Sequence, residues 1–203
     1  ELLEPSWQLL QGISTALGPN SSEGASARSL LAELLNKVGE RDESLDHLRQ
    51  ALVAQTASKG AEHVDTVRLK IFTAGILHND PLKAAPDEAI ELLTEAHSTC
   101  ARSYSEWSPI TMTAERNLIF ALLSRQHWAL AFNIGVNSTK RNIDRLNNPS
   151  SLAIYRRSLQ ALASAPPCRT KTTEFNGECG TISAALAMIA TRPPVTQKEI
   201  HHD

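Results

Sequence analysis

Two cysteines near the C-terminal end are the side chains best placed for covalent or metal chemistry. Cys168 and Cys179 flank an irregular stretch with ten residues between them, so a disulfide is geometrically conceivable. Such a bond would close a modest loop and contribute about 3 kcal/mol at most. Zinc would need further ligands, but His201 and His202 are distant and the sequence has no Cys-x-x-Cys pair. We therefore favour two free thiols.

The other candidate ligands and nucleophiles form no recognisable catalytic or metal site. His97 and Cys100 stand three residues apart on one helical face, but a lone pair of ligands does not make a metal site. Cys100 shares its face with Ala96 and is expected in the core. The sequence has no nucleophile with its base, no phosphate-binding loop and no carboxylate pair held by a motif. We expect no catalytic residues, no metal, no cofactor and no enzymatic activity.

The charged side chains are unevenly distributed along the chain. Its 203 residues carry 20 Lys+Arg and 22 Asp+Glu, which gives a net charge of −2. Residues 1–65 hold 10 acids and 5 bases, whereas residues 140–171 hold 7 bases and 1 acid. The basic segment is either a docking surface for an anionic partner or an ordinary solvated ridge, which we favour. The candidate anionic-partner patch consists of Lys140, Arg141, Arg145 and Arg157.

Composition excludes several classes of protein. A near-neutral chain does not look like a generic nucleic-acid binder, and its apolar runs are far shorter than the roughly 20 residues of a membrane span. Few aromatic residues and glycines argue against an all-β fold. No signal peptide is visible. We expect an intracellular protein, cytoplasmic by default, with an imported organelle such as the mitochondrion as the close alternative.

Helical periodicity dominates the sequence. Leu31, Leu35 and Val38 belong to one apolar stripe on a helix that starts near Ser26 and ends at Gly39. Asp42 is the expected N-cap of the next helix. Further helices are expected over residues 5–17, 42–52, 67–77, 90–100, 109–123, 127–146, 150–163 and 181–191, with a loop over 164–180. The last helix is expected to pack against the helix over 150–163.

The predicted helices come in pairs that repeat along the chain. Residues 42–51 align with residues 87–96 without a gap. The small residues Ser44, Ala89 and Ala131 then fall 45 and 42 positions apart. A spacing of this size is typical of helix-pair solenoids. The corresponding positions in the first helices are Ala32, Gly75 and Ile119.

This pattern resembles a tetratricopeptide repeat (TPR) array, in particular the long-repeat variety of kinesin light chains. The family's linker of the type Gly-x-x-His-x-Asp-Thr matches residues 60–66, and Ile119 departs from the pattern because it is large. The alternative is an irregular helical bundle. Small residues are expected where the helices of a hairpin cross, because an added methyl would force them apart. The matching positions are Ala32 and Gly75, then Ser44, Ala89 and Ala131, and finally Ala51, Ala96 and Ser138.

The resemblance implies a groove lined by the first helix of each pair. Apolar side chains there would supply contact area, and Arg and Asn would bind a partner's backbone or carboxylates. The alternative is that Phe72 and Phe120 are buried between stacked hairpins. The predicted partner-binding residues are Glu33, Lys37, Phe72, Ile76, Asn79, Arg116, Asn117, Phe120 and Arg156.

We therefore predict an all-α protein, a right-handed α-solenoid of about three TPR-like hairpins with capping helices. Residues 1–25 would form a capping helix and turn, residues 26–163 the repeat domain, and residues 164–203 a loop with a capping helix or tail. The predicted function is a non-catalytic scaffold that binds a partner protein or serves as a subunit of a larger assembly. The alternative is a helical-repeat protein that contacts nucleic acid through residues 140–171.

Overall fold

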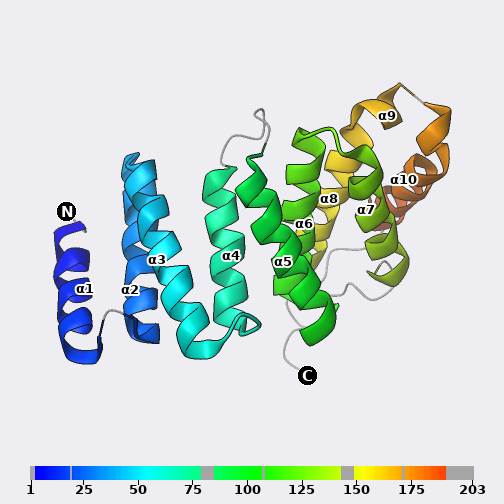
Figure 1. The fold of residues 1–203 in the computed structure, drawn as a ribbon. Coiled ribbons are helices and arrows are strands. Elements are labelled where there is room, and N and C mark those ends of the chain that lie inside the picture. Colours follow the sequence, from blue (N-terminus) through cyan, green and yellow to red (C-terminus); the bar gives the residue numbers. More distant parts are fainter. Residues whose placement is uncertain are drawn as a thin grey trace. The chain divides into compact units, whose positions relative to one another are not determined.

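The structure is a computed structural model in which the protein is all-α (Figure 1). It describes residues 3–18, 20–78, 85–106, 108–142, 149–170 and 172–190. Within these ranges every regular element is a helix, and the helices group into two compact units. Unit 1 contains α1 (Leu3–Leu17), α2 (Ser22–Val38), α3 (Arg41–Lys59), α4 (Val64–Leu77) and α5 (Asp87–Ser103). Unit 2 contains α6 (Pro109–Ser124), α7 (Trp128–Asn142), α8 (Pro149–Ser164), α9 (Pro166–Arg169), the 3₁₀ helix η1 (Thr173–Phe175) and α10 (Asn176–Ala190).

The ends of the helices follow local capping chemistry. Ser21 caps α2, because its Oγ accepts a hydrogen bond from the N–H of Gly24 at 3.0 Å, so the helix begins before the predicted Ser26. Gly39 ends α2 in the left-handed conformation, as predicted (φ 97°). The prediction that Asp42 caps the next helix is wrong. The N-cap of α3 is Glu40, and Asp42 lies inside the first turn, where a carboxylate still suits the helix dipole.

Small residues allow the helices of the first hairpin to cross closely. The Oγ of Ser44 on α3 donates a hydrogen bond of 2.7 Å to the carbonyl of Ala32 on α2, and both residues are fully buried. The expectation for Gly75 is wrong, because this glycine is exposed and a Cβ there would meet nothing, whereas the neighbouring Ala74 is fully buried. The other predicted small positions are all buried, namely Ala51, Ala89, Ala96, Ala131 and Ser138.

Polar contacts join the two hairpins of unit 1. The Nη2 of Arg41, at the start of α3, donates to the carbonyls of Ile76 and Leu77 at 2.8 and 2.7 Å, which satisfies carbonyls at the end of α4. Arg49 on α3 binds both carboxylate oxygens of Glu88 on α5, at 3.0 and 2.8 Å. This hydrogen bonding lowers the pKa of the Glu88 carboxyl. These contacts tie α3 to both helices of the second hairpin.

The first helix covers the end of unit 1. Trp7 and Leu10 of α1 pack against a cluster on α2 that includes Leu31 and Leu35. The ring of Trp7 also lies edge-on to the ring of His47 on α3, with 5.1 Å between the ring centroids. The helix expected over residues 5–17 is therefore present as α1 and packs on α2. No helix in the described ranges is both long and apolar enough to cross a membrane.

Unit 2 differs from the prediction between residues 164 and 180. Instead of a loop, this stretch contains α9, η1 and the first turn of α10. Pro166 occupies the first turn of α9, where its missing N–H costs no hydrogen bond. The helix α10 packs against α8, as expected, and also against α7, burying Ile182, Ala185 and Ile189. The carboxyl-terminal part of the predicted 127–146 helix lies outside the described residues.

Two glycines that lie within helices should respond in opposite ways to alanine. At Gly135 on α7 a Cβ would collide with the buried side chain of Leu162, so Gly135→Ala should cost about 1–3 kcal/mol of packing energy. Gly75→Ala meets nothing and should gain about 1 kcal/mol through helix propensity. We expect a net loss of about 1 kcal/mol for Gly135→Ala, since it too gains propensity. Urea unfolding of both variants measures the difference, and equal shifts would contradict this account.

His47 should make folding stability depend on pH. Burial, and then Arg28, lower its pKa from 6.5, whereas Glu43 and Asp46 act in the opposite direction. The unfolded state therefore binds more protons, so stability should fall as the pH drops through 6.5 and level off below the folded-state pKa. The unfolding free energies of the wild type and His47→Gln should be compared between about pH 7.5 and about pH 5. An identical pH slope in the two proteins would contradict the assignment.

Candidate partner-binding groove

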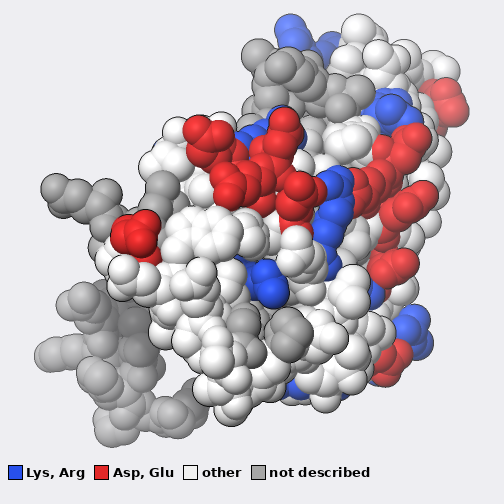
Figure 2. All heavy atoms as spheres, turned by 60° about the vertical axis from the view of Figure 1, so that its left-hand side comes forward, with Lys and Arg blue, Asp and Glu red and all other residues white. Residues whose placement is uncertain are grey.

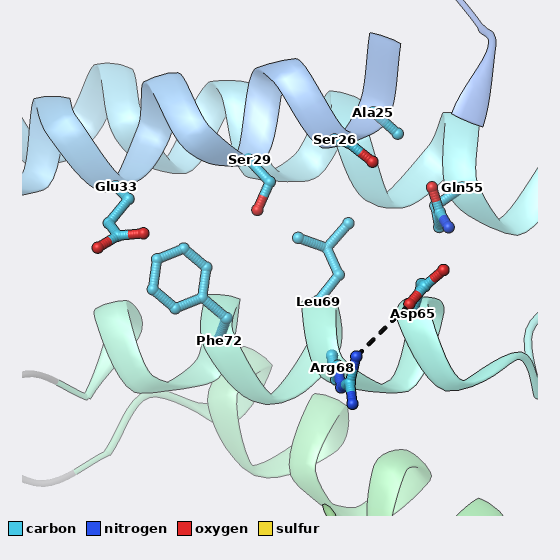
Figure 3. A pocket seen from close by; sticks show the side chains of 9 residues that line it. All are labelled: Ala25, Ser26, Ser29, Glu33, Gln55, Asp65, Arg68, Leu69 and Phe72. Atoms are coloured by element: carbon cyan, nitrogen blue, oxygen red, sulfur yellow. Dashed lines mark ion pairs between the residues drawn. The ribbon is translucent and has the colours of Figure 1, made fainter. Parts of the chain in front are cut away.

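A cavity of about 300 Å³ lies between α2 and α4 in unit 1. Figure 3 shows side chains of the two helices pointing toward one another across it, with Gln55 of α3 at one end. The first helices of two successive pairs form its walls, as the TPR resemblance implies. The lining residues are Ala25, Ser26, Ser29 and Glu33 of α2, Gln55 of α3, and Asp65, Arg68, Leu69 and Phe72 of α4.

The cavity combines an apolar wall with polar groups that are available for hydrogen bonds. Leu69 and the half-buried Phe72 supply the apolar wall. Gln55 is only 3% exposed as a residue, and its amide makes no hydrogen bond within the described part of the chain. An amide carries both donors and an acceptor, and those of Gln55 are not among the fully buried unpaired atoms, so they are reachable from the cavity. A bound molecule with a matching donor and acceptor can therefore pair with this amide.

The charged residues at the cavity are already partly compensated. Glu33 pairs with Lys37 at 2.7 Å, and both side chains are exposed. Asp65 binds Lys59 at 2.8 Å and lies 3.8 Å from Arg68. The hydrogen bond from Lys59 holds the pKa of the Asp65 carboxyl below its usual value. The cavity therefore offers an almost neutral rim rather than a strong site for either sign of charge.

The predicted groove residues of unit 1 differ in their position relative to the cavity. Glu33 and Phe72 line the cavity, and Lys37 stands beside it as the ion partner of Glu33. Ile76 does not line this cavity; it is 4% exposed and belongs to the hydrophobic core of the two hairpins. Asn79 lies outside the described residues.

Sequence reasoning missed several residues of the cavity. Ser26 and Ser29 precede Glu33 at helical spacing on α2, and Arg68 precedes Phe72 by one turn on α4, so the same periodicity could have identified them. Gln55 had no such signal. It lies on the second helix of its pair, and only the packing of α3 behind α2 and α4 brings it to the cavity.

In unit 2, positive side chains gather on α6 and α8. The Nε and Nη2 of Arg116 donate to the Oδ1 of Asn117 at 3.1 and 3.0 Å, which orients the guanidinium. Burial, and then the charge of Arg157, lower the pKa of Arg116. Neither Arg116 nor Arg157 forms an ion pair with any described residue, and the same holds for the exposed Arg156. Phe120 is half-buried.

Three of the four predicted members of the anionic-partner patch are described by the structure, and these three do not form one free positive surface. Arg141 is ion-paired with Glu115 at 2.9 Å and with Glu106 at 3.5 Å. Lys140 is exposed at the end of the same helix, whereas Arg157 lies beside Arg116. Arg145 lies outside the described residues. The described groups of His, Cys, Asp and Glu include no set of three or more that could hold a metal ion.

Figure 2 shows acidic side chains gathered on one face of the molecule, with basic side chains among them. In unit 1, exposed acids lie on the second helices of the pairs, including Asp42 and Asp46 on α3 and Glu91 on α5. Arg49 bridges part of this surface through Glu88. The acids of unit 1 therefore lie both on the second helices of the pairs and, as Glu33 and Asp65, on the walls of the cavity.

Two glutamates that share Arg141 should differ in their contribution to stability. Glu115 is 5% exposed and accepts a hydrogen bond of 2.7 Å from the buried Ser138 hydroxyl, so Glu115→Ala leaves that hydroxyl without this acceptor. We expect a loss of about 2 kcal/mol. The matched control is Glu106→Ala, an exposed ion pair expected to cost less than about 1 kcal/mol. Chemical denaturation measures both, and an equal effect would refute the distinction.

Comparison with known proteins supports the fold. No protein-family model matches the chain, and no curated protein matches it. Two crystal structures of a Podosopora anserina kinesin light chain-type protein with nearly identical TPR-like repeats, one of them a point variant, each match with a TM-score of 0.72 and 19% identity. These matches cover 94% of this chain and 88% and 87% of the other chains.

A third solved structure, BtubC (BKLC) from P. vanneervenii, matches with a TM-score of 0.65 and 16% identity, over 86% of this chain and 68% of that one. At these identities the likeness concerns the arrangement of helices and not any bound partner. The paired helices, the small residues at their crossings and the matched structures lead to one conclusion. The chain has the fold of TPR-like helical-repeat proteins.

Proposed function

We propose that this protein is a non-catalytic interaction scaffold that holds an extended segment of a partner protein in the cavity between α2 and α4. The observation that carries this proposal is that the Gln55 amide lines the cavity, makes no hydrogen bond in the described part of the chain, and is not one of its fully buried unpaired groups. Its donors and acceptor are therefore reachable from the cavity, where water or a ligand can bind them.

The chemistry of the cavity fits a main chain better than a small charged ligand. An extended peptide presents an N–H and a C=O at each residue, which match the donors and the acceptor of one amide. Leu69 and Phe72 offer apolar contact to a side chain of the same segment, and Ser29 offers a hydroxyl from the opposite wall. Recognition of this kind is sequence-tolerant along the main chain and selective at the apolar side chain.

Unit 2 supplies a second surface for the same role. Arg116, Asn117, Phe120 and Arg156 combine positive charge with a half-buried aromatic ring, which would suit an acidic part of a partner. A subunit of a larger assembly would use such surfaces permanently rather than transiently. The nucleic-acid alternative finds less support, because Arg141 of the basic segment is neutralised by Glu115 and Glu106.

The compartment proposed from composition needs adjustment. The structure contains a Cys168–Cys179 disulfide, which the sequence analysis did not favour. Structural disulfides persist in oxidising compartments and are rare in the reducing cytoplasm. Of the two locations considered, a disulfide that stays formed fits an imported organelle with an oxidising space better, whereas a bond that is reversibly reduced is also compatible with the cytoplasm.

A site-specific photo-crosslinker tests the groove directly. A benzophenone amino acid in place of Ser29, which lines the cavity, should form a discrete adduct with a partner when the chain is expressed in its source cells. The same amino acid in place of Val53, which is 67% exposed on α3, is the positional control. Mass spectrometry of the adducts identifies the partner.

The partner's affinity then tests the cavity residues. Phe72→Ala and Gln55→Leu should each weaken binding about 10-fold or more, as expected for central contacts. Leu30→Ala, which truncates an exposed apolar side chain of α2, should leave it unchanged. Equal adducts from positions 29 and 53, or full binding by both cavity variants, would exclude the groove as the binding site.

A further inference from the structure

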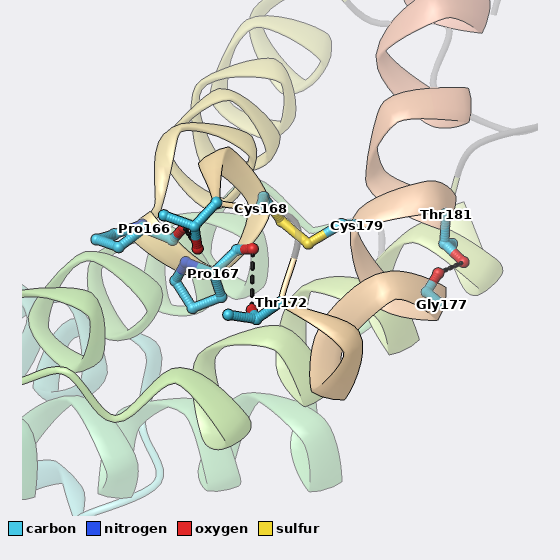
Figure 4. The surroundings of a disulfide bond; sticks show 8 residues. Pro166, Pro167, Cys168, Thr172, Gly177, Cys179 and Thr181 are labelled. Atoms are coloured by element: carbon cyan, nitrogen blue, oxygen red, sulfur yellow. Dashed lines mark hydrogen bonds between the residues drawn. A yellow bond between two sulfur atoms is a disulfide. The ribbon is translucent and has the colours of Figure 1, made fainter.

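The disulfide between Cys168 and Cys179 lies where the short helix α9 meets the first turn of α10. Figure 4 shows the bond joining these two elements. The Cα atoms of the two cysteines lie 5.5 Å apart, and the bond closes a short loop that contains η1. The disulfide therefore cross-links α10 to α9, the segment that follows α8, in addition to the backbone between them.

The α9 side of this link is held independently of the disulfide. The N–H and Oγ1 of Thr170 both donate to the carbonyl of Pro166, at 2.9 and 2.8 Å. The N–H and Oγ1 of Thr172 donate likewise to the carbonyl of Pro167, at 3.1 and 3.0 Å. Pro167 is also buried. Opening the disulfide removes none of these hydrogen bonds.

The helix on the other side of the disulfide, α10, is held in place by fewer interactions. Gly177 and Gly180 lie near its start, are exposed, and would accommodate a Cβ without any contact, so packing does not require glycine at either position. Glycines in a helix lower its stability without compensation here. A helix of this length is also marginal on its own in water. What remains is one apolar face, with Ile182, Ala185 and Ile189 buried against α7 and α8.

The two bonded cysteines are more exposed than the third cysteine of the chain. Cys168 and Cys179 are both partly exposed, whereas the third cysteine, Cys100, is fully buried. A disulfide is opened by attack of a thiolate on one sulfur, which requires access to that sulfur. The exposure therefore separates this cysteine pair from Cys100 in reactivity as well as in structure.

We propose that Cys168–Cys179 is a redox-active site for a dithiol reductant of the thioredoxin type, and that its reduction releases α10 from α7 and α8. One thiolate of the reductant attacks a cysteine sulfur and forms a mixed disulfide, while the other cysteine leaves as a thiolate and takes up a proton. The second thiol of the reductant then resolves the mixed disulfide. Two electrons pass to the chain, which ends with two thiols, and the reductant ends as a disulfide.

Release of α10 would uncover its buried residues Ile182, Ala185 and Ile189, together with the parts of α7 and α8 against which this helix packs. A surface of this kind on a scaffold is a conditional binding site, available only in the reduced state. This inference does not depend on the groove of unit 1 and can fail or succeed separately.

Hydrogen exchange of the full chain, followed by mass spectrometry, tests the proposal. Treatment with dithiothreitol, or with a thioredoxin-type dithiol protein, should raise the exchange rates of the α10 amides by about 100-fold, the factor expected from loss of a cross-link over a loop of this size. The amides of α6 and of unit 1 should keep their rates. Binding of a hydrophobic dye should rise in parallel.

The cysteine variants provide the controls. Cys168→Ser with Cys179→Ser should show the fast exchange of α10 without reductant and should not respond to it, whereas Cys100→Ser should respond like the wild type. Unchanged α10 exchange after reduction would overturn the proposal. Cooperative unfolding of all of unit 2 on reduction would also overturn it, because the bond would then stabilise the whole unit instead of holding α10 alone. The proposal would also be overturned if thiol titration of the chain, purified without reductant, found all three cysteines free.

Discussion

The close crossing of two helices at small side chains is the constraint on which the rest of unit 1 depends. At the crossing of α2 and α3, the Ser44 hydroxyl donates a hydrogen bond to the carbonyl of Ala32, and both residues are fully buried. The same packing of α3 against α2 and α4 places Gln55 at the cavity, although this residue belongs to the second helix of its pair. A polar group of the cavity thus depends on a packing requirement some three helical turns away.

The charge distribution fits this arrangement. Exposed acids such as Asp42 on α3 and Glu91 on α5 lie on the helices that Arg49 and Glu88 join, whereas the acids on the walls of the cavity are paired with nearby bases. The small net charge of the chain is therefore not a uniform property of its surface. In unit 2, Arg141 forms ion pairs with two glutamates. Arg116 and Arg157 have no acidic partner in the described chain.

Much of the fold could be predicted because local signals and packing signals agree. Gly39 both ends α2 and needs the left-handed conformation, and Pro109 suits the first turn of α6. The errors arose where tertiary contacts decide. Nothing local distinguishes the exposed Gly75 from the buried Ala74, and Ile76 fits a groove or a core by periodicity alone. The disulfide depended on α9 and η1 bringing two cysteines together, and that turn has no periodic signal.

The place of Gln55 on a core-forming helix has a consequence for how the lining of the cavity can change over evolutionary time. The half-buried Ser29 and the exposed Arg68 stand on the walls of the cavity, so substitutions there change its surface at little cost to folding. The position of Gln55 is different, because a substitution there also acts on the core of the hairpin. If the cavity binds a partner as proposed, contacts along its walls can diverge among descendants of this chain, while the polar contact from Gln55 is inherited with the fold.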